Sequence, residues 1–523
     1  MLSPLIGLSI FFHVSKLANA EAPTVALKYG VFQGTANGNL STFLGVPFAQ
    51  PAVRFELPRA PKLLHGIQNA TVFGPACPQQ ALSIPAGFPP GIIRMQPEVS
   101  EDCLQLNVFA PRSATPRSGL PVLVWFFGGG WVEGSSSDTD VGPLVERSIA
   151  TGEPIIIVTP NYRLSAFGYL GGKEVIDAGI SNLGSRDQIF ALEWVQEHIS
   201  EFGGNPAEVV IAGAVSTALL LLSNKRFEPT ALFRGAFMMS GSPITAPSVA
   251  DGQADYDELV AANDCAKSQN TLDCLRHIPL DAFKATVDNT TNFLSFSSLN
   301  ITWRPRVDGD VIPEDPLISV SKGLYAKIPI MTGDADDEGT IFSLSNTNIT
   351  TSDEFLGYIH SNYFPKSTPA QITEIAKLYP DDPTQAPFQG DYFFIGPRRL
   401  FLQHASQTQN TWSWLNKRGK TTPILGAAHE VEVGMWFPPA NVTDFVLADA
   451  FINFINTLDP NYSSNGRNIS VFWPKWSTPL SDGSPPLFTL SDPNITSITP
   501  DNFRTAAIGF LNDLLLTEAV HSG

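Results

Sequence analysis

Short apolar runs, mostly β-branched, alternate along this sequence with stretches of helical periodicity. Five runs are apolar almost throughout, which is typical of strands covered on both faces: residues 121–127, 154–163, 209–213, 235–241 and 327–334. Ser185 and Gln188 match a capping box, and apolar residues follow them at helical spacing: Ile189, Leu192, Val195, Ile199 and Phe202. Strands that alternate with helices predict an α/β fold with a large, mainly parallel, doubly wound sheet flanked by helices.

No feature of the sequence indicates a boundary between domains. Its 523 residues, 43% of them hydrophobic, show no internal repeat, low-complexity linker or abrupt change of composition. We therefore expect residues 21–523 to form one large domain. A final helix is expected near the C-terminus, with Phe503, Ala507, Phe510 and Leu514 facing the body of the protein. The formal net charge of −18 argues against binding to nucleic acid or to anionic membranes.

The first 20 residues have the composition of a cleaved signal peptide. An apolar stretch from Leu5 to Phe12 is followed by Ala18, Asn19 and Ala20, although no positive charge precedes the apolar part. That stretch is too short to span a bilayer, and no later segment supplies about 20 uninterrupted apolar residues. The sequence thus predicts a secreted protein, extracellular or in the lumen of the secretory pathway, without a membrane span.

Cysteines and glycosylation sequons agree with secretion. Four cysteines allow three pairings, and proximity in sequence favours Cys77 with Cys103 and Cys265 with Cys274. Metal binding is the weaker interpretation, because no CxxC pair or histidine cluster accompanies them, and neither a metal nor a cofactor is expected. Acceptor sequons for N-glycosylation occur at Asn39, Asn69, Asn289, Asn300, Asn348, Asn441, Asn461, Asn468 and Asn494.

The segment VVIAGAVSTALLLL, residues 209–222, has the layout of a nucleophile elbow. A buried strand meets a turn of small residues, and the turn opens directly into a leucine-rich helix. In serine hydrolases this junction carries G-x-S-x-G, with the serine held on a sharp turn. Here the corresponding residues are Gly213, Ala214, Val215, Ser216 and Thr217, so a serine is present one position late.

Nine further segments carry a resemblance to a known family. In order they are FLGVPFAQP (43–51), SEDCLQLNVFAP (100–111), WFFGGGWVEGS (125–135), PNYRLSAFGYL (160–170), SRDQIFALEWVQEHISEFGGNP (185–206), MMSGSP (238–243), GDADDEGTIF (333–342), GAAHEVE (426–432) and WPKW (473–476). With these motifs the chain resembles the type-B carboxylesterases and lipases, the cholinesterase-related branch of the α/β-hydrolase fold. The matches run through nearly the whole chain after residue 20, so the resemblance implies that fold.

The resemblance places the catalytic acid on Glu338 and the catalytic base on His429, in the family's order along the chain. The nucleophile position falls on Val215, whose side chain has no lone pair with which to attack. A β-branched residue tolerates the strained elbow conformation badly, so we expect the elbow to have relaxed towards an ordinary strand–turn–helix connection. The family's H-G-G-G, which supplies oxyanion donors, becomes Phe127 followed by Gly128, Gly129 and Gly130.

Two residue sets at this site have alternative interpretations. The position of Ser216 has two interpretations: it is the N-cap or a first-turn residue of the following helix, or it is a displaced nucleophile. A misplacement of about 1 Å makes such a nucleophile ineffective. Glu338 and His429 are either a leftover buried pair, kept because separating them costs about 1–3 kcal/mol, or a pair in which His429 bonds a ligand hydroxyl.

Three functions follow from these alternatives. The first is a catalytically inactive protein whose apolar pocket binds an aromatic small molecule. The residues expected to line this pocket are Phe127, Gly128, Gly129, Gly130, Trp131, Val215, Ser216 and His429. The aromatic residues Phe126, Phe127 and Trp131 either contact the ligand or are simply part of the core. The second is an active secreted carboxylesterase or lipase that uses Ser216 with His429 and Glu338. The third is a protein-interaction module, like the adhesion proteins of this family that lack the serine.

Among inactive members, the chain is most similar to hydrolase-like proteins of fungal secondary-metabolite pathways. Secretion, the cysteine pattern of fungal lipases and the missing nucleophile are the shared features. The similarity implies a dirigent-like auxiliary, as in viriditoxin-type biosynthesis, that controls the stereoselectivity of phenol coupling in an aromatic polyketide. A secreted laccase, or another multicopper oxidase, is then the expected partner.

Overall fold

The computed structural model describes residues 22–82, 84, 88, 98–223, 229–380, 386–439 and 441–520. The predicted signal peptide, residues 1–20, lies outside the described residues. The strands are β1 (Thr24–Leu27), β2 (Gly30–Gln33), β3 (Thr35–Asn37), β4 (Leu40–Pro47), β5 (Ile67–Asn69), β6 (Gln105–Pro111), β7 (Leu120–Trp125), β8 (Ile156–Pro160), β9 (Gly204–Gly213), β10 (Gly235–Met239), β11 (Ile330–Ala335), β12 (Thr411–Asn416), β13 (Pro486–Ser491) and β14 (Ile495–Pro500).

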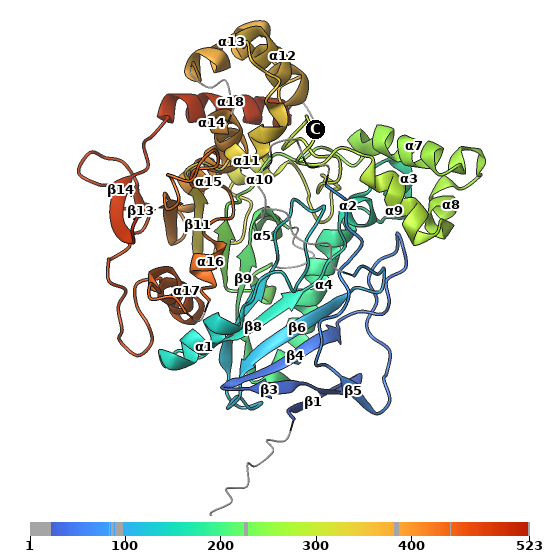
Figure 1. Cartoon of the computed structure of the whole chain (residues 1–523), viewed down its shortest axis with the longest axis vertical. Coiled ribbons are helices and arrows are strands. Elements are labelled where there is room, and N and C mark those ends of the chain that lie inside the picture. The colour runs from blue at the N-terminus through green and yellow to red at the C-terminus, as the bar shows by residue number, and fades with distance from the viewer. Residues whose placement is uncertain are drawn as a thin grey trace, which may run out of the picture.

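Within the described part of the chain, eleven of these strands form one large sheet in the order β14-β13-β12-β11-β10-β9-β7-β8-β6-β4-β3, and β1, β2 and β5 form a small second sheet (Figure 1). The pairs from β8 through β7, β9, β10, β11 and β12 to β13 are parallel, and the pairs at both ends of the large sheet are antiparallel. The predicted α/β fold with a mainly parallel sheet is confirmed. All five predicted strands are present, as β7, β8, β9, β10 and β11.

Helices cover both faces of the sheet. They are α1 (Gly142–Ala150), α2 (Ser165–Tyr169), α3 (Lys173–Ala178), α4 (Leu183–His198), α5 (Val215–Leu222), α6 (Pro229–Leu232), α7 (Gln253–Ala262), α8 (Thr271–His277), α9 (Leu280–Asp288), α10 (Pro316–Ser321), α11 (Thr340–Ser343), α12 (Ser352–Asn362), α13 (Pro369–Leu378), α14 (Ala386–Gly390), α15 (Gly396–Ala405), α16 (Val433–Trp436), α17 (Val446–Thr457) and α18 (Thr505–Val520).

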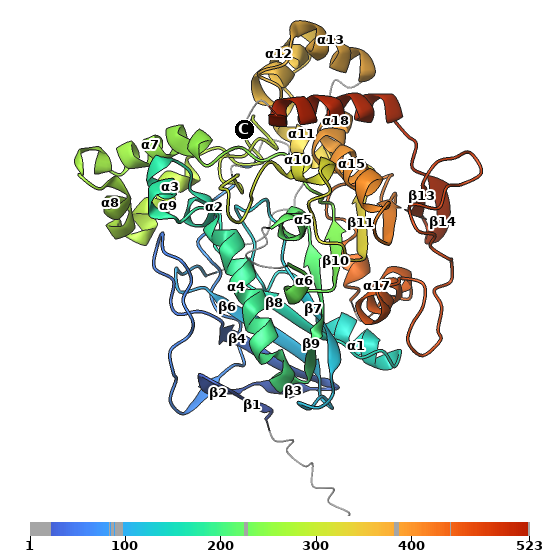
Figure 2. The same cartoon turned by 180° about the vertical axis from the view of Figure 1, so that it is seen from behind.

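Two apolar clusters, one on each face, form the core. Helices α1 and α17 close one face through residues such as Leu144 and Phe451. The other face carries α4, α5, α15 and α18, and α4 lies in front of the strands in Figure 2. The apolar residues predicted for α4 are buried, with Leu192 and Val195 fully so. Ala507 and Leu514 of α18 are buried as expected, whereas Phe510 of α18 and Phe503, which precedes the helix, are half-buried.

The capping box predicted at Ser185 is wrong. Helix α4 begins at Leu183, two residues earlier, with Asn182 as its N-cap residue in the left-handed conformation. The Asn182 side chain is bonded elsewhere, because it donates to the Arg306 carbonyl and accepts from the Arg306 N–H. Ser185 is a buried residue inside the helix. A long-range contact, rather than a local capping motif, therefore sets the start of this helix.

Both predicted disulfides are present, Cys77–Cys103 and Cys265–Cys274. Asn461 is the exception among the predicted glycosylation sites: it is 3% exposed, and its side-chain amide donates to Asp459 and to the Trp473 carbonyl, so this fold has no room for a glycan there. The other predicted asparagines are exposed. Within the residues described, no helix is long and apolar enough to cross a membrane.

Candidate functional site

The loops that follow β7, β9, β11 and β12 converge on a cavity of about 330 Å³ at the carboxyl ends of the strands. This is where open α/β sheets place their ligands, and the volume lies within the range of small-molecule sites. All the residues predicted to line a pocket do so: Phe127, Gly128, Gly129, Gly130, Trp131, Val215, Ser216 and His429. Most of the remaining wall is aromatic or aliphatic, with Phe293, Phe342 and Phe394 among its members.

Glu338 and His429 form a tight pair at one side of the cavity. Nδ1 of His429 lies 2.6 Å from Oε2 of Glu338, whose other oxygen accepts from the Ala335 N–H at 2.6 Å. The Glu338 side chain is fully buried, whereas that of His429 is 19% exposed. Burial lowers the pKa of His429, but the charge and hydrogen bond of Glu338 outweigh it and raise that pKa to about 9. His429 therefore carries a positive charge at neutral pH.

The two loops that carry this pair are joined by backbone and side-chain bonds. The Asp337 N–H donates to the Ala427 carbonyl, and the Asp337 carboxylate accepts from the Ala427 N–H. Gly426, in the left-handed region at φ 63°, makes the approach possible, because a Cβ there would lie 2.2 Å from an Asp337 oxygen. The Glu338–His429 geometry is thus held by residues on both sides of it.

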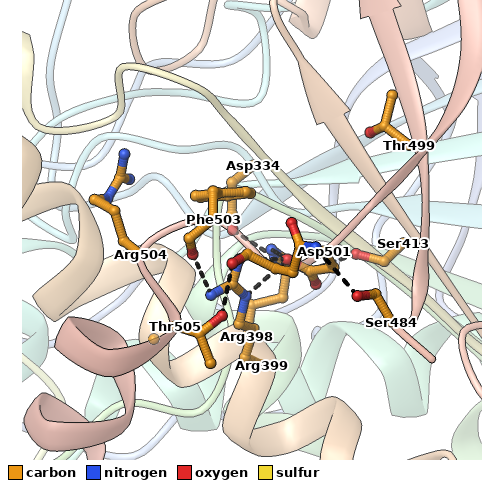
Figure 3. Close-up of polar contacts among 12 residues, drawn as sticks. Asp334, Arg398, Arg399, Ser413, Ser484, Thr499, Asp501, Phe503, Arg504 and Thr505 are labelled. Atoms are coloured by element: carbon orange, nitrogen blue, oxygen red, sulfur yellow. Dashed lines mark hydrogen bonds and ion pairs between the residues drawn. The ribbon is translucent and has the colours of Figure 1, made fainter. Parts of the chain in front are cut away.

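An ionic cluster supports the same loops from behind (Figure 3). Arg398, fully buried in α15, donates to Asp334 at the end of β11, to Ser413 in β12 and to Asp501 before α18. Arg399 donates to Asp501 as well. Burial and the neighbouring charge of Glu338 raise the pKa of Asp334 to about 7 against the pull of Arg398. These bonds tie together the strand ends from which the acid and base loops emerge.

At the elbow, Val215 does not have the positive φ of a strained nucleophile, whereas the turn before it is irregular. Val215 is the first residue of α5, is 5% exposed, and is absent from the non-glycine residues with positive φ. Ala214 is the N-cap residue, with φ −119° and ψ −126° and no side-chain cap. Thr217, which stands at the last glycine of the elbow motif, is fully buried, and its hydroxyl has no hydrogen-bond partner among the described residues. The nucleophile position is therefore the first residue of a helix, and the chain enters it through Ala214, whose φ and ψ lie outside the strand and helix regions.

Ser216 lies in the first turn of α5, so it is a first-turn residue and not the N-cap. Its Oγ accepts a hydrogen bond from the indole N–H of Trp131 at 2.9 Å. In the part of the chain that the structure describes, no hydrogen bond joins Ser216 to His429. The Ser216 hydroxyl thus positions the Trp131 ring, and its oxygen already accepts one donor.

Phe127 and Trp131 both line the cavity and pack in the core. The Phe127 ring stacks on Tyr162 with centroids 4.4 Å apart, and the Tyr162 hydroxyl donates to the Phe127 carbonyl. Phe126, also on the wall, is 1% exposed. The two interpretations of these aromatic residues are therefore compatible, because the same rings belong to the apolar core and border the cavity.

Sequence reasoning missed two acidic residues next to His429. Glu432 is fully buried and accepts from the Ser240 hydroxyl at 3.0 Å, and its second oxygen has no hydrogen-bond partner in the described part of the chain. Burial, with the charge of Glu338, raises its pKa to about 8. Glu430 adopts the left-handed conformation at φ 68° and lies against Gly128. Both residues belong to the segment GAAHEVE (426–432), in which the resemblance assigns a role only to His429.

No group of three or more histidine, cysteine or acidic residues in the described chain is arranged to hold a metal ion. The site is a mainly apolar cavity at the ends of these strands, with His429, Glu430 and Glu133 on its wall and Glu338 bonded to His429. Val215 lies where the resemblance places the nucleophile.

Comparison with known proteins decides the family. The model of the carboxylesterase family matches residues 21–489. This chain belongs to the carboxylesterase family. The family member described here is 33% identical to secreted lipase 1 of Botryotinia fuckeliana over 89% of each chain, and 34% identical to lipase 5 of Diutina rugosa over 94% of this chain and 96% of that one. The crystal structure of Aspergillus niger EstA superimposes with a TM-score of 0.81 at 26% identity, covering 95% and 98% of the two chains. The α/β-hydrolase fold and the type-B carboxylesterase resemblance are thereby confirmed.

Proposed function

We propose that this chain is a secreted carboxylesterase-family protein that binds an apolar aromatic small molecule and does not hydrolyse esters. One observation carries the proposal: the Glu338–His429 pair faces a cavity of about 330 Å³ whose nucleophile position is Val215. Acyl transfer needs a nucleophile activated by the base, and valine has no atom that can attack. The retained cavity and base instead suit a ligand that presents a hydroxyl group.

The biological role we propose is that of a dirigent-like auxiliary in fungal polyketide secondary metabolism. A laccase, or another secreted multicopper oxidase, makes phenoxyl radicals that couple from either face unless a chiral surface favours one approach. A difference of about 1.4 kcal/mol between competing transition states gives tenfold selectivity. A hydrogen bond from His429 contributes about 0.5–1.5 kcal/mol, and unequal packing against Phe127 and Trp131 adds to it.

The test is a coupling reaction with a laccase, an aromatic polyketide phenol and the purified protein, followed by chiral separation of the dimers. We expect the protein to change the stereoisomer ratio without changing the rate of phenol oxidation. His429→Ala should weaken the bias several-fold, whereas the exposed His277→Ala, on α8, should leave it intact. An unchanged ratio across several phenols at saturating protein contradicts the dirigent role.

A second candidate is an active carboxylesterase or lipase, because the relatives named above are lipases and Ser216 lines the cavity. Against it stands the hydrogen bond from Trp131 to Ser216. We expect the purified protein to hydrolyse short p-nitrophenyl esters no faster than buffer, and Ser216→Ala to make no difference. Clear turnover that Ser216→Ala abolishes establishes the hydrolase instead.

A further inference from the structure

The glycine turn after β7 faces an acidic wall. In a hydrolase, the backbone N–H groups of such a turn hold the negative oxygen that develops during acyl transfer. Here Oε1 of Glu430 lies 2.7 Å from the point where a Cβ on Gly128 would stand. The backbone carbonyl of Glu133 lies against the next glycine, Gly129, and both Glu133 and Glu430 are among the residues that line the cavity.

The backbone places Glu430 there at a cost. A non-glycine residue in the left-handed region is strained, and Glu430 is in that region at φ 68°. This conformation lets two consecutive side chains, His429 and Glu430, both line the cavity. A strained residue that carries a charge into a ligand cavity is a feature expected of a binding site rather than of packing.

A carboxylate beside the turn changes what the turn can bind. A ligand carboxylate or an oxyanion placed there meets the charge of Glu430, and the positive charge of His429 is already paired with Glu338. A neutral hydroxyl group, in contrast, can donate to a Glu430 oxygen. A carboxylate offers about four acceptor positions, so Glu430 can accept a ligand donor in addition to its bonds within the protein.

We propose that Glu430 makes this cavity a site for hydroxylated aromatic rings and excludes carboxylates of the same shape. The ligand hydroxyl donates to Glu430, its ring packs among the phenylalanines of the wall, and a second oxygen on the ring accepts from His429. This inference rests on the proposed function and deepens it, because it names the ligand group that the pocket selects.

The experiment measures binding of three matched probes by calorimetry at pH 7. The probes share one ring system: 2-naphthol, which donates a hydrogen bond; 2-methoxynaphthalene, which cannot; and 2-naphthoate, which is ionised. We expect 2-naphthol to bind about tenfold more tightly than 2-methoxynaphthalene and 2-naphthoate to bind most weakly. Glu430→Gln should strengthen 2-naphthoate and weaken 2-naphthol, so that the preference between them falls about tenfold or more.

Two further variants keep the result interpretable. Glu258→Gln, an exposed residue of α7, makes the same chemical change away from the cavity and should leave all three affinities unchanged. Gly128→Ala introduces a methyl group where the Glu430 oxygen now lies, so it should displace the carboxylate and reduce the preference in the same direction as Glu430→Gln. Melting temperatures confirm that each variant is folded.

The outcomes separate the two proposals. If none of the probes binds the wild type, the proposed small-molecule function itself is contradicted. If all three bind and 2-naphthoate binds as tightly as 2-naphthol, the pocket stands and the role of Glu430 is overturned. The same conclusion follows if folded Glu430→Gln and Gly128→Ala keep the wild-type preference.

Discussion

The two halves of this site come from one sheet and differ in what they have retained. On the β11 and β12 side, Glu338 and His429 keep a 2.6 Å contact. On the β9 side, Val215 stands where the resemblance places the nucleophile, and this residue begins α5 without the positive φ of a strained elbow. A nucleophile elbow is strained and is maintained only for its reaction, so its loss relaxes the backbone. A buried acid–base pair, in contrast, is costly to break, so it persists whether or not it still works.

The ionic cluster gives the largest expected effect on this comparison. Arg398→Met leaves Asp334 and Asp501 buried without their main cation, and breaking such a pair costs about 3–5 kcal/mol. We expect that loss in the free energy of unfolding measured by urea denaturation. Arg147→Met breaks an arginine–aspartate pair that is about a quarter exposed and should cost about 1 kcal/mol or less. Equal losses in the two variants contradict the idea that this cluster supports the acid–base half.

How far the sequence predicts the structure also differs between the two halves. The strands β7 to β11 are foreseen because they are covered on both faces and are apolar almost throughout. Strand β12 is missed: its sequence TWSWLN alternates polar and aromatic residues, yet the strand is buried at every position. Ser413 in this strand accepts a hydrogen bond from Arg398, which precedes it by 15 residues, and one-dimensional patterning does not reveal such contacts.

The site residues divide in the same way. Those at motif positions, such as His429 and Glu338, are located by the resemblance, and the relaxation at Val215 follows from its β-branched side chain. No sequence signal points to Glu430, because its position beside Gly128 depends on one left-handed backbone angle. The Ser216–Trp131 bond joins residues 85 positions apart, so it too becomes visible only in the folded chain.

The pH dependence of stability sharpens the comparison with a middle-sized effect. Burial raises the pKa of Glu432 to about 8 in the folded protein, from its ordinary value of 4.5. Because the pKa of Glu432 is raised in the folded protein, the folded state binds a proton that the unfolded state has already released between about pH 4.5 and pH 8. The free energy of unfolding therefore decreases as the pH rises through this range. Glu432→Gln should therefore gain about 1–3 kcal/mol over the wild type above pH 8 and little at pH 4.

Chemical denaturation at several pH values checks this prediction. The glutamine can still accept from Ser240, so the variant removes the charge and keeps the hydrogen bond. Glu258→Gln, exposed on α7, should show the wild-type pH profile. A constant difference between Glu432→Gln and the wild type from pH 4 to pH 9 shows that Glu432 does not titrate in this range.

The smallest expected effect comes from returning a serine to the nucleophile position. Val215→Ser supplies a hydroxyl at the first residue of α5, but the backbone there lacks the sharp elbow that points a nucleophile at its base. Thr217 remains where the motif has glycine, and the Glu430 carboxylate still lies against the turn that would hold an oxyanion. Because about 1 Å of misplacement costs about a hundredfold in rate, we expect p-nitrophenyl ester hydrolysis by this variant within about tenfold of background.

Combining the changes tests whether the remaining half of the site is still competent. Val215→Ser with Thr217→Gly and Glu430→Gly provides the hydroxyl, frees the space at the elbow and removes the carboxylate from the turn. If the Glu338–His429 pair is intact machinery, this triple variant should exceed Val215→Ser in ester hydrolysis by about tenfold or more, and His429→Ala should abolish the gain. High activity in Val215→Ser alone means instead that the elbow recovers its geometry as soon as a serine is present. In that case the β9 half of the site would have lost only one side chain, and its backbone would still be able to adopt the elbow conformation.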